Sequence, residues 1–200
     1  MKHQMSEKYR KYLVKLILDK KVYYCIWGTD MSDDCETDFI LLNKEKKIVL
    51  FEKLININKR IMAYRRHFFD KKNFYTWVNE NSFSKSYSTI DIDILQIDSI
   101  STFGIFLKNK TNALKFIDTI NFIRDFAEQT RNNELLRRLK NQYIKKTWDF
   151  IYNRYFWQSR RKSGDMILQT PNLRKVDLLN LLSIHTSFSN SLIINKVHTS

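Results

Sequence analysis

Five carboxylates crowd one short polar stretch of the chain, and carboxylates can bind cations or act as general acids and bases. They are Asp30, Asp33, Asp34, Glu36 and Asp38. A calcium loop needs alternating Asp-x-Asp-x-Asp-Gly spacing and a terminal glutamate, and this stretch has neither. Two other interpretations stay open: a solvated loop, and an acidic surface that docks on a basic partner. We take these five residues as the first candidate for a partner-binding site.

The other titratable residues give no recognisable catalytic arrangement. Asp91 and Asp93 alternate with isoleucines and Asp98 follows, but no base or nucleophile lies near them in the sequence. The histidines are scattered and lack the spacing of a metal-binding pair. They are His3, His67, His185 and His198. No nucleophile elbow occurs. We therefore expect a protein that is not an enzyme, with no catalytic residue, cofactor or metal.

The cysteines and the N-terminal segment bear on the compartment. Cys25 and Cys35 lie outside any C-x-x-C motif, which disfavours a zinc site and favours a reduced, unpaired state in the cytoplasm. The first apolar run is interrupted by lysines, so we expect neither a signal peptide nor a membrane span. The chain has 3 glycines, too few to suggest a phosphate-binding loop.

The chain is strongly basic, and the excess charge is concentrated in its C-terminal half. The net charge is +14. Such a balance is typical of proteins that bind nucleic acid, an acidic membrane surface or an acidic protein, and also of a solvated lysine-rich surface. The segment 131–162 is the most basic part of the chain. Its candidate binding face comprises Arg137, Arg138, Lys140, Lys145 and Lys146.

Aromatic residues interleave with this basic run, as they do in grooves that stack nucleic-acid bases. They are Tyr143, Trp148, Tyr152 and Trp157. Most of them fall on or beside the apolar stripe of the helix predicted here, which favours a place in the core. Nucleic-acid binding therefore remains the alternative function.

Apolar periodicity predicts the elements that position these residues. We expect helices over 6–20, 53–69 and 71–80, and strands over 22–27, 38–43, 47–52 and 90–94. Segment 102–107 is predicted to be a further strand or the continuation of the preceding one. The residues 43–46 form the polar connection of a hairpin. Consecutive strands joined by short links favour an antiparallel meander.

The C-terminal half is predicted to be helical. One helix is predicted to be capped by Thr111, and a second, capped by Asn132 or Asn133, continues to about Tyr155. A last helix over 172–183 is predicted to bury one apolar face, formed by Leu173, Val176, Leu179 and Leu182. The fold class is α+β in a single domain 1–200: an antiparallel sheet of four or five strands with an N-terminal helix (1–107), a helical half (108–185) and a frayed tail (186–200).

Two strings in the helical half resemble a known family. Ile120–Asp125 (INFIRD) resembles the aromatic-Asn-hydrophobic-Phe-x-Asp helix of small immunity proteins from bacterial contact-dependent growth inhibition and polymorphic toxin systems. Tyr152–Trp157 (YNRYFW) is similar to the Tyr-Asp-Lys-Leu-Phe-Trp helix end of those proteins. The start of the chain agrees in style, with an aromatic strand that leads into a Trp-Gly-acidic loop.

The resemblance implies a non-enzymatic protein that binds one cognate toxin domain and blocks its active site or partner surface. It also implies that Asn121 and Asp125 fix helix packing through buried hydrogen bonds. We therefore expect an immunity protein of the toxin–antitoxin kind that neutralises its toxin by occlusion. Either the acidic stretch or the basic face is its binding surface.

Overall fold

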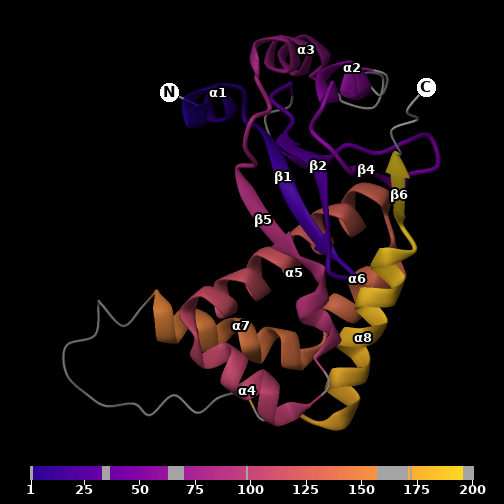
Figure 1. Ribbon diagram of the computed structural model, residues 1–200. Coiled ribbons are helices and arrows are strands. Elements are labelled where there is room, and N and C mark those ends of the chain that lie inside the picture. Colours follow the sequence, from indigo (N-terminus) through magenta and orange to yellow (C-terminus); the bar gives the residue numbers. More distant parts are fainter. Residues whose placement is uncertain are drawn as a thin grey trace.

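A computed structural model describes residues 2–32, 37–62, 70–97, 99–156, 171 and 173–195, which form one sheet and two groups of helices (Figure 1). The strands are β1 (Lys11–Leu18), β2 (Lys21–Thr29), β3 (Asp38–Ile40), β4 (Ile48–Phe51), β5 (Ser88–Asp91) and β6 (Leu192–Asn195). The helices are α1 (Lys2–Tyr9), α2 (Ile57–Met62), α3 (Lys71–Glu80), the 3-10 helix η2 (Ile92–Gln96), α4 (Ile100–Lys108), α5 (Lys110–Thr130), α6 (Asn133–Leu139), α7 (Gln142–Tyr155) and α8 (Lys175–Ser189).

The sheet is mixed, whereas the sequence predicted an antiparallel one. Its order is β5-β1-β2-β4-β6, and β3 also pairs with β2. The β1–β2, β2–β3 and β2–β4 pairs are antiparallel, but β5 runs parallel to β1 and β6 runs parallel to β4. Both parallel strands enter from distant parts of the chain, and parallel pairing requires such long crossovers. Local hairpin signals could not reveal them.

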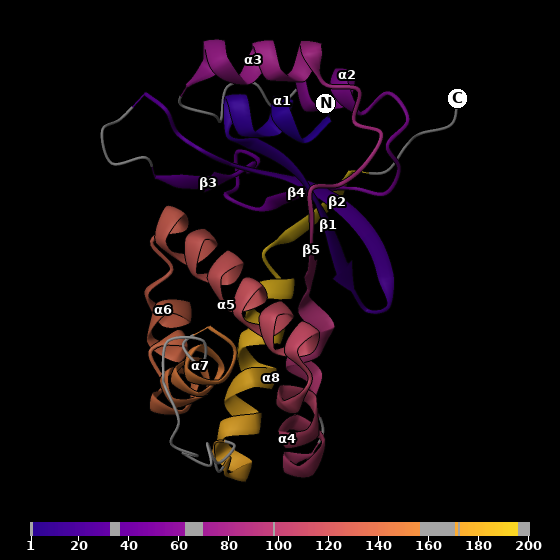
Figure 2. The ribbon, with the colours of Figure 1, turned by 90° about the vertical axis from the view of Figure 1, so that its left-hand side faces the viewer.

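The sheet separates two apolar cores (Figure 2). On one face α1, α2 and α3 cover residues such as Leu13, Ile26 and Phe51. On the other face the helices α4 to α8 form the larger layer. Because neighbouring strand residues point to opposite faces, β1 divides its side chains between the two cores. The coarse expectation of an α+β fold with a helical C-terminal half on the sheet is confirmed.

The predicted helix over 6–20 is wrong, because helix α1 ends at Tyr9 and strand β1 begins at Lys11. Tyr12, Val14, Leu16 and Leu18 belong to the larger core while Leu13 belongs to the smaller one. A central strand that is buried on both faces has a nearly continuous apolar run, which periodicity alone does not distinguish from a buried helix. Strand β2 and helix α3 lie where the sequence predicted them.

Segment 102–107 lies inside α4 and is not a strand. Ser99 caps this helix by accepting a hydrogen bond from the Thr102 amide. The strand predicted over 90–94 is only partly correct, because β5 ends at Asp91 and the isoleucines that follow continue as the 3-10 helix η2. The helical half therefore begins at Ile100 and not at residue 108. Of the predicted helix 53–69, the structure describes α2, while residues 63–69 lie outside the described part.

The helix predicted to run to Tyr155 is two helices, α6 and α7. Asn132 caps α6 as expected, and Asn141 caps α7 by accepting a hydrogen bond from the Tyr143 amide. A second asparagine cap inside a periodic apolar pattern is the local signal for this break. Helix α5 is capped by Asn109 rather than by Thr111.

The frayed tail predicted over 186–200 is wrong for residues 186–195, and residues 196–200 lie outside the described part. Helix α8 continues to Ser189, and β6 then adds a strand to the edge of the sheet. The apolar face predicted for this helix is also wrong: Val176, Leu179 and Leu182 are exposed, and only Leu173, which precedes the helix, is buried. The buried face is formed by Asp177, Leu181, Ile184, His185 and Phe188. None of the helices formed by the described residues is long and apolar enough to cross a bilayer.

Candidate functional site

A groove of about 420 Å³ lies where the larger helical layer meets the sheet, between α5 and the strands β1, β2, β3 and β5. We call it the acidic groove. Figure 2 shows α5 passing beneath the sheet toward β3, which places one flank of the helix against these strands. The lining residues are Val14, Trp27, Asp38, Tyr87, Ser88, Ile90, Asp118, Asn121, Phe122 and Asp125. Three of them are carboxylates, in a protein whose net charge is +14.

Asp125 is the central carboxylate of this groove. It is half-buried on α5, and its Oδ2 accepts a hydrogen bond of 3.3 Å from the indole Nε1–H of Trp27 on β2. Burial raises the pKa of Asp125 to about 7, the Asp38 carboxylate adds to the increase, and the Trp27 hydrogen bond opposes it. A carboxyl with this pKa changes its charge near neutral pH.

The groove carboxylates lack cationic partners within the described part of the chain. The Arg124 guanidinium, one residue before Asp125, lies 5.3 Å from the ring centre of Trp148 and so is engaged on α7. Asp38 is held by the hydroxyl of Thr29 at 2.7 Å, and Asp118 is exposed on α5. No described Lys or Arg forms an ion pair with any of these three carboxylates.

Two aromatic side chains, Trp27 and Tyr87, line the groove together with the carboxylates. Trp27 lies 5.2 Å from Tyr12, and Tyr12 lies 4.4 Å from Tyr87, measured between ring centres. Tyr87 donates a hydrogen bond to Glu7, which also accepts one from Tyr12. Burial and the nearby Glu7 carboxylate raise the pKa of Tyr12 to about 12, so this ring stays neutral. The groove thus combines negative charge with aromatic surface.

The two described members of the acidic stretch, Asp30 and Asp38, lie in different environments. Asp30 is buried, and its Oδ1 accepts hydrogen bonds from the amide and hydroxyl of Ser32. Asp38 reaches the acidic groove at the end of β3. Asp33, Asp34 and Glu36 lie outside the described residues, as does Cys35. Asp30 is thus not accessible as a contact residue, because its side chain is buried and accepts hydrogen bonds within its own turn.

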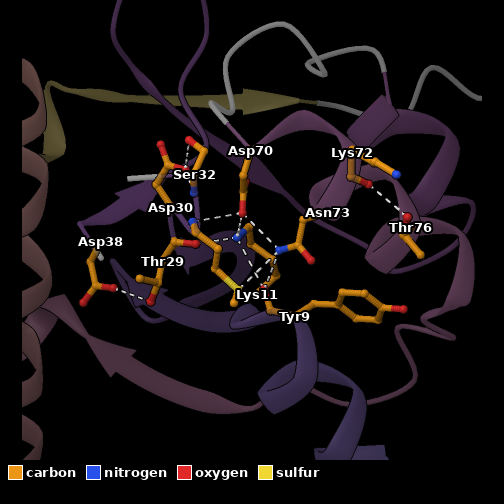
Figure 3. A network of polar contacts seen from close by, with 11 residues as sticks. Tyr9, Lys11, Thr29, Asp30, Ser32, Asp38, Asp70, Lys72, Asn73 and Thr76 are labelled. Atoms are coloured by element: carbon orange, nitrogen blue, oxygen red, sulfur yellow. Dashed lines mark hydrogen bonds and ion pairs between the residues drawn. The ribbon is translucent and has the colours of Figure 1, made fainter. Parts of the chain in front are cut away.

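A buried ion pair between Lys11 and Asp70 lies close to Asp30 (Figure 3). Lys11 of β1 is fully buried, and its Nζ donates to Asp70 Oδ2 at 2.6 Å and to the carbonyl of Thr29. Asn73 donates to the same Asp70 oxygen at 3.0 Å. Burial lowers the pKa of Lys11, an effect that Asp70 partly offsets. The network joins β1, β2 and α3 beneath the smaller core.

The sequence contains no local signal for the Lys11–Asp70 pair at either residue. The two residues are far apart in the chain, and Lys11 stands before an apolar run in which no motif marks it. Gly28 gave a usable signal. A Cβ atom at Gly28 would lie 2.5 Å from Lys11 Cδ and 2.7 Å from the Arg10 carbonyl oxygen. A glycine inside an aromatic strand is typical of a site where another chain segment approaches closely.

The candidate basic face is split between two environments. Arg138 pairs with Glu134 at 2.6 Å on α6, whereas Arg137 and Lys146 are exposed. Lys140 and Lys145 are exposed and line a second cavity, of about 460 Å³, on the other flank of α5. Its lining residues are Arg124, Glu128, Leu136, Leu139, Lys140, Asn141, Ile144, Lys145, Trp148 and Asp149.

The aromatic residues of the basic run contribute little free stacking surface. Tyr143 is buried, and Trp148 and Tyr152 stack on each other with ring centres 5.5 Å apart. Trp157 lies outside the described residues, as do the arginines at 160 and 161 and the lysine at 162. Most of the described rings therefore act as packing residues, as the apolar stripe predicted.

The structure brings Asp93 and His185 together with Asp19. Their ligand atoms lie within 4.8 Å of one another, and no ion is needed to explain the arrangement. Asp19 and Lys20 form the tight turn between β1 and β2, with φ values of 49° and 61°. Asp93 accepts hydrogen bonds of 2.7 Å from both of their amides. Asp93 therefore fixes this turn, and His185 packs beneath it against Gln96.

Of the remaining titratable residues named above, only Asp91 and Cys25 are described at the level of the side chain. Asp91 is half-buried at the end of β5, while Asp98, His67 and His198 lie outside the described residues, as does the side chain of His3. Cys25 is a buried free thiol, and burial raises its pKa, which keeps it protonated and unreactive.

Comparisons with known proteins support the fold and not a function. No family model matches the chain, and no curated protein matches it. The fold is similar to the C-terminal domain of SatS, whose crystal structure was solved in complex with bromine. That similarity covers 95% of this chain and 96% of the SatS domain, with a TM-score of 0.59 and 8% sequence identity.

Proposed function

We propose that this protein is an immunity protein that binds a cognate bacterial toxin domain in the acidic groove and neutralises it by occlusion, without catalysis. The observation that carries the proposal is the set of groove carboxylates, Asp38, Asp118 and Asp125, with which no described Lys or Arg forms an ion pair. Unneutralised carboxylates beside aromatic rings favour a basic element of a protein partner.

The resemblance to immunity proteins adds support from the same place. Asn121 and Asp125 belong to the first resembling string, and Trp27 begins the Trp-Gly-acidic loop. All three line the acidic groove. The resemblance implied buried hydrogen bonds that fix helix packing, whereas Asp125 accepts a part-buried hydrogen bond from a strand residue, Trp27. Residues from two of the resembling segments thus line the same groove.

The charge distribution agrees with this mechanism. Fixed charges act over about 8 Å at physiological ionic strength, so a groove is dominated by its own carboxylates rather than by the net charge of the molecule. A basic toxin would be oriented toward the groove by this local field, while the positive surface elsewhere would disfavour other docking positions. Occlusion then needs only that the bound protein cover the toxin's active site or its partner surface.

A growth assay tests this function. If the neighbouring genes encode a toxin domain, it is expressed in a sensitive bacterium, alone and together with the protein. We expect toxin expression to stop growth, co-expression to restore it, and the two purified proteins to elute as one complex. Growth arrest that persists despite equal amounts of folded protein, or the absence of a toxin domain from the neighbouring genes, would contradict the proposal.

The second cavity favours nucleic-acid binding as a second candidate function. Arg124, Lys140 and Lys145 surround it, and Trp148 offers an aromatic edge. Phosphate contacts of this kind make affinity fall steeply with salt. A salt titration with single-stranded and double-stranded probes distinguishes the candidates. Measurable affinity that collapses with salt, and that is lost in Lys140→Ala/Lys145→Ala, supports nucleic-acid binding. No binding at low salt rules it out.

A further inference from the structure

We propose that the acidic groove is built to receive an arginine side chain of the partner, stacked against Trp27 and paired with Asp125. This inference rests on the proposed function for the identity of the partner, but the chemistry of the groove can be tested without the toxin.

The shape and composition of the groove favour a guanidinium over other cations. Two aromatic side chains, Trp27 and Tyr87, line the groove, and each packs against Tyr12, with ring centres 5.2 Å and 4.4 Å apart. The groove also offers carboxylates from two elements, Asp38 beside β2 and Asp125 on α5. A guanidinium is planar, stacks on aromatic faces and donates up to five hydrogen bonds, whereas an ammonium is a compact and strongly hydrated charge.

Apolar residues of the groove lining can pack against the methylene groups of the partner's arginine. Val14, Ile90 and Phe122 line the groove and are buried members of the larger core. The methylene groups of a long basic side chain pack on such apolar surface while the charged head stays with polar groups. A small inorganic cation would leave this surface without a contact. The apolar residues therefore favour an arginine over a metal ion.

The protein's own basic residues do not fill this role within the described chain. Arg124 is engaged by Trp148 across α5. Lys115, which lies near Asp91, and Lys15 are absent from the groove lining. The groove is thus complementary to a cation that must come from outside the described residues. Its unsatisfied electrostatics are what a partner's arginine would complete.

Binding in this groove should be coupled to proton release. The charged groups that face Asp125 are Asp38 of β3 and Glu128 of its own helix, which raise its pKa, and Arg124, which lowers it. Trp27 of β2 contributes the hydrogen bond and Asp118 of α5 lines the same groove. With the pKa of Asp125 at about 7, the carboxyl must lose its proton to pair with a guanidinium. Affinity therefore rises by about tenfold between pH 6 and pH 8, as the ionised fraction grows.

The test is a titration followed by nuclear magnetic resonance. The Trp27 indole N–H is the reporter, because it donates a hydrogen bond to Asp125 and both residues line the groove. Its signal is assigned by the loss of one indole peak in Trp27→Phe. The probes are N-acetyl-arginine amide and N-acetyl-citrulline amide, which share their length and shape but differ in charge. N-acetyl-lysine amide tests the choice between guanidinium and ammonium.

We expect the arginine amide to shift the Trp27 indole signal to saturation, with an affinity about tenfold higher at pH 8 than at pH 6. Citrulline should not shift it, and Asp125→Asn should abolish the response. The matched control is Glu52→Gln, which removes one exposed charge outside the groove and should respond as wild type. Equal shifts with arginine and citrulline, no response to arginine, or a preference for lysine would overturn the inference.

Failure of this inference is distinguishable from failure of the proposed function. If the toxin forms a complex that Asp125→Asn leaves unchanged, the immunity function stands and the arginine pocket is wrong. If arginine amide binds as described but no toxin is neutralised, the pocket stands and the immunity function is wrong. Dispersed amide signals from both cores in each variant show that the variant is folded.

Discussion

The replacement Asp125→Asn should change stability in a pH-dependent direction, because it removes a carboxyl that is costly to ionise. In the folded protein burial raises the pKa of Asp125 to about 7, whereas an unfolded Asp titrates near 3.9. Between these values the native state holds a proton that the unfolded state has lost. Ionising Asp125 therefore costs stability as the pH rises from about 4 to about 7, and the cost is complete above pH 7.

The magnitude follows from the size of this difference. Each pKa unit corresponds to about 1.4 kcal/mol, so full burial of an unpaired carboxylate would cost about 4 kcal/mol. Asp125 is only half-buried and solvent screens its charge, which reduces the expected cost to about 1–2 kcal/mol. Asparagine keeps the shape and an oxygen acceptor for the Trp27 indole without the charge.

We therefore expect the stability advantage of Asp125→Asn over wild type to be small at pH 5 and to grow to about 1–2 kcal/mol at pH 8. Urea denaturation, followed by circular dichroism at both pH values, measures this difference. Glu52→Gln is the control, since an exposed carboxylate should give no such pH dependence. Destabilisation by Asp125→Asn at pH 8 would refute the reasoning, because it would mean that the ionised carboxylate stabilises the fold.

Three further predictions concern the scaffold. Gly28→Ala should lower stability by about 1–3 kcal/mol in chemical denaturation, since the new methyl group would lie 2.5 Å from Lys11 Cδ; an unchanged midpoint would contradict this packing. Lys11→Met should cost about 3–5 kcal/mol by leaving Asp70 buried without its partner. Much of that loss should be recovered in the double variant Lys11→Met/Asp70→Asn, and no recovery would argue against a paired charge. Asn141→Ala should cost about 1 kcal/mol by removing the α7 cap, with the serine variant as the conservative control; equal stability of all three proteins would exclude a capping role.

The elements that sequence analysis placed correctly are those with strong local signals. Helices α3 and α5 show clear apolar periodicity, and the hairpin after β3 has a polar connection. Strand β1 was predicted to be a helix because it is buried on both faces, so its apolar residues do not alternate with polar ones. The parallel pairing of β5 and β6 was not predicted for a different reason, since the partners of these strands are set by tertiary packing.

Individual residues of the candidate site could be predicted from the sequence, but their arrangement in space could not. The sequence pointed to Asp38 as a member of an acidic stretch and to Asp125 as a helix-packing residue. Their approach depends on how α5 crosses under β3, which no local pattern encodes. Asp30, in contrast, is adjacent to other acids in sequence and yet is withdrawn by its Ser32 contacts. Proximity in sequence was therefore a poor guide to proximity on the surface.

The affinity of the toxin domain for wild type, Asp125→Asn and Glu52→Gln is the measurement that tests the central claim most directly. Isothermal titration calorimetry at pH 8 gives each dissociation constant. A central charge pair in an interface is worth about 2 kcal/mol or more, so Asp125→Asn should weaken binding by about 30-fold or more while Glu52→Gln binds as wild type. Identical affinities for all three proteins would contradict a partner site in the acidic groove.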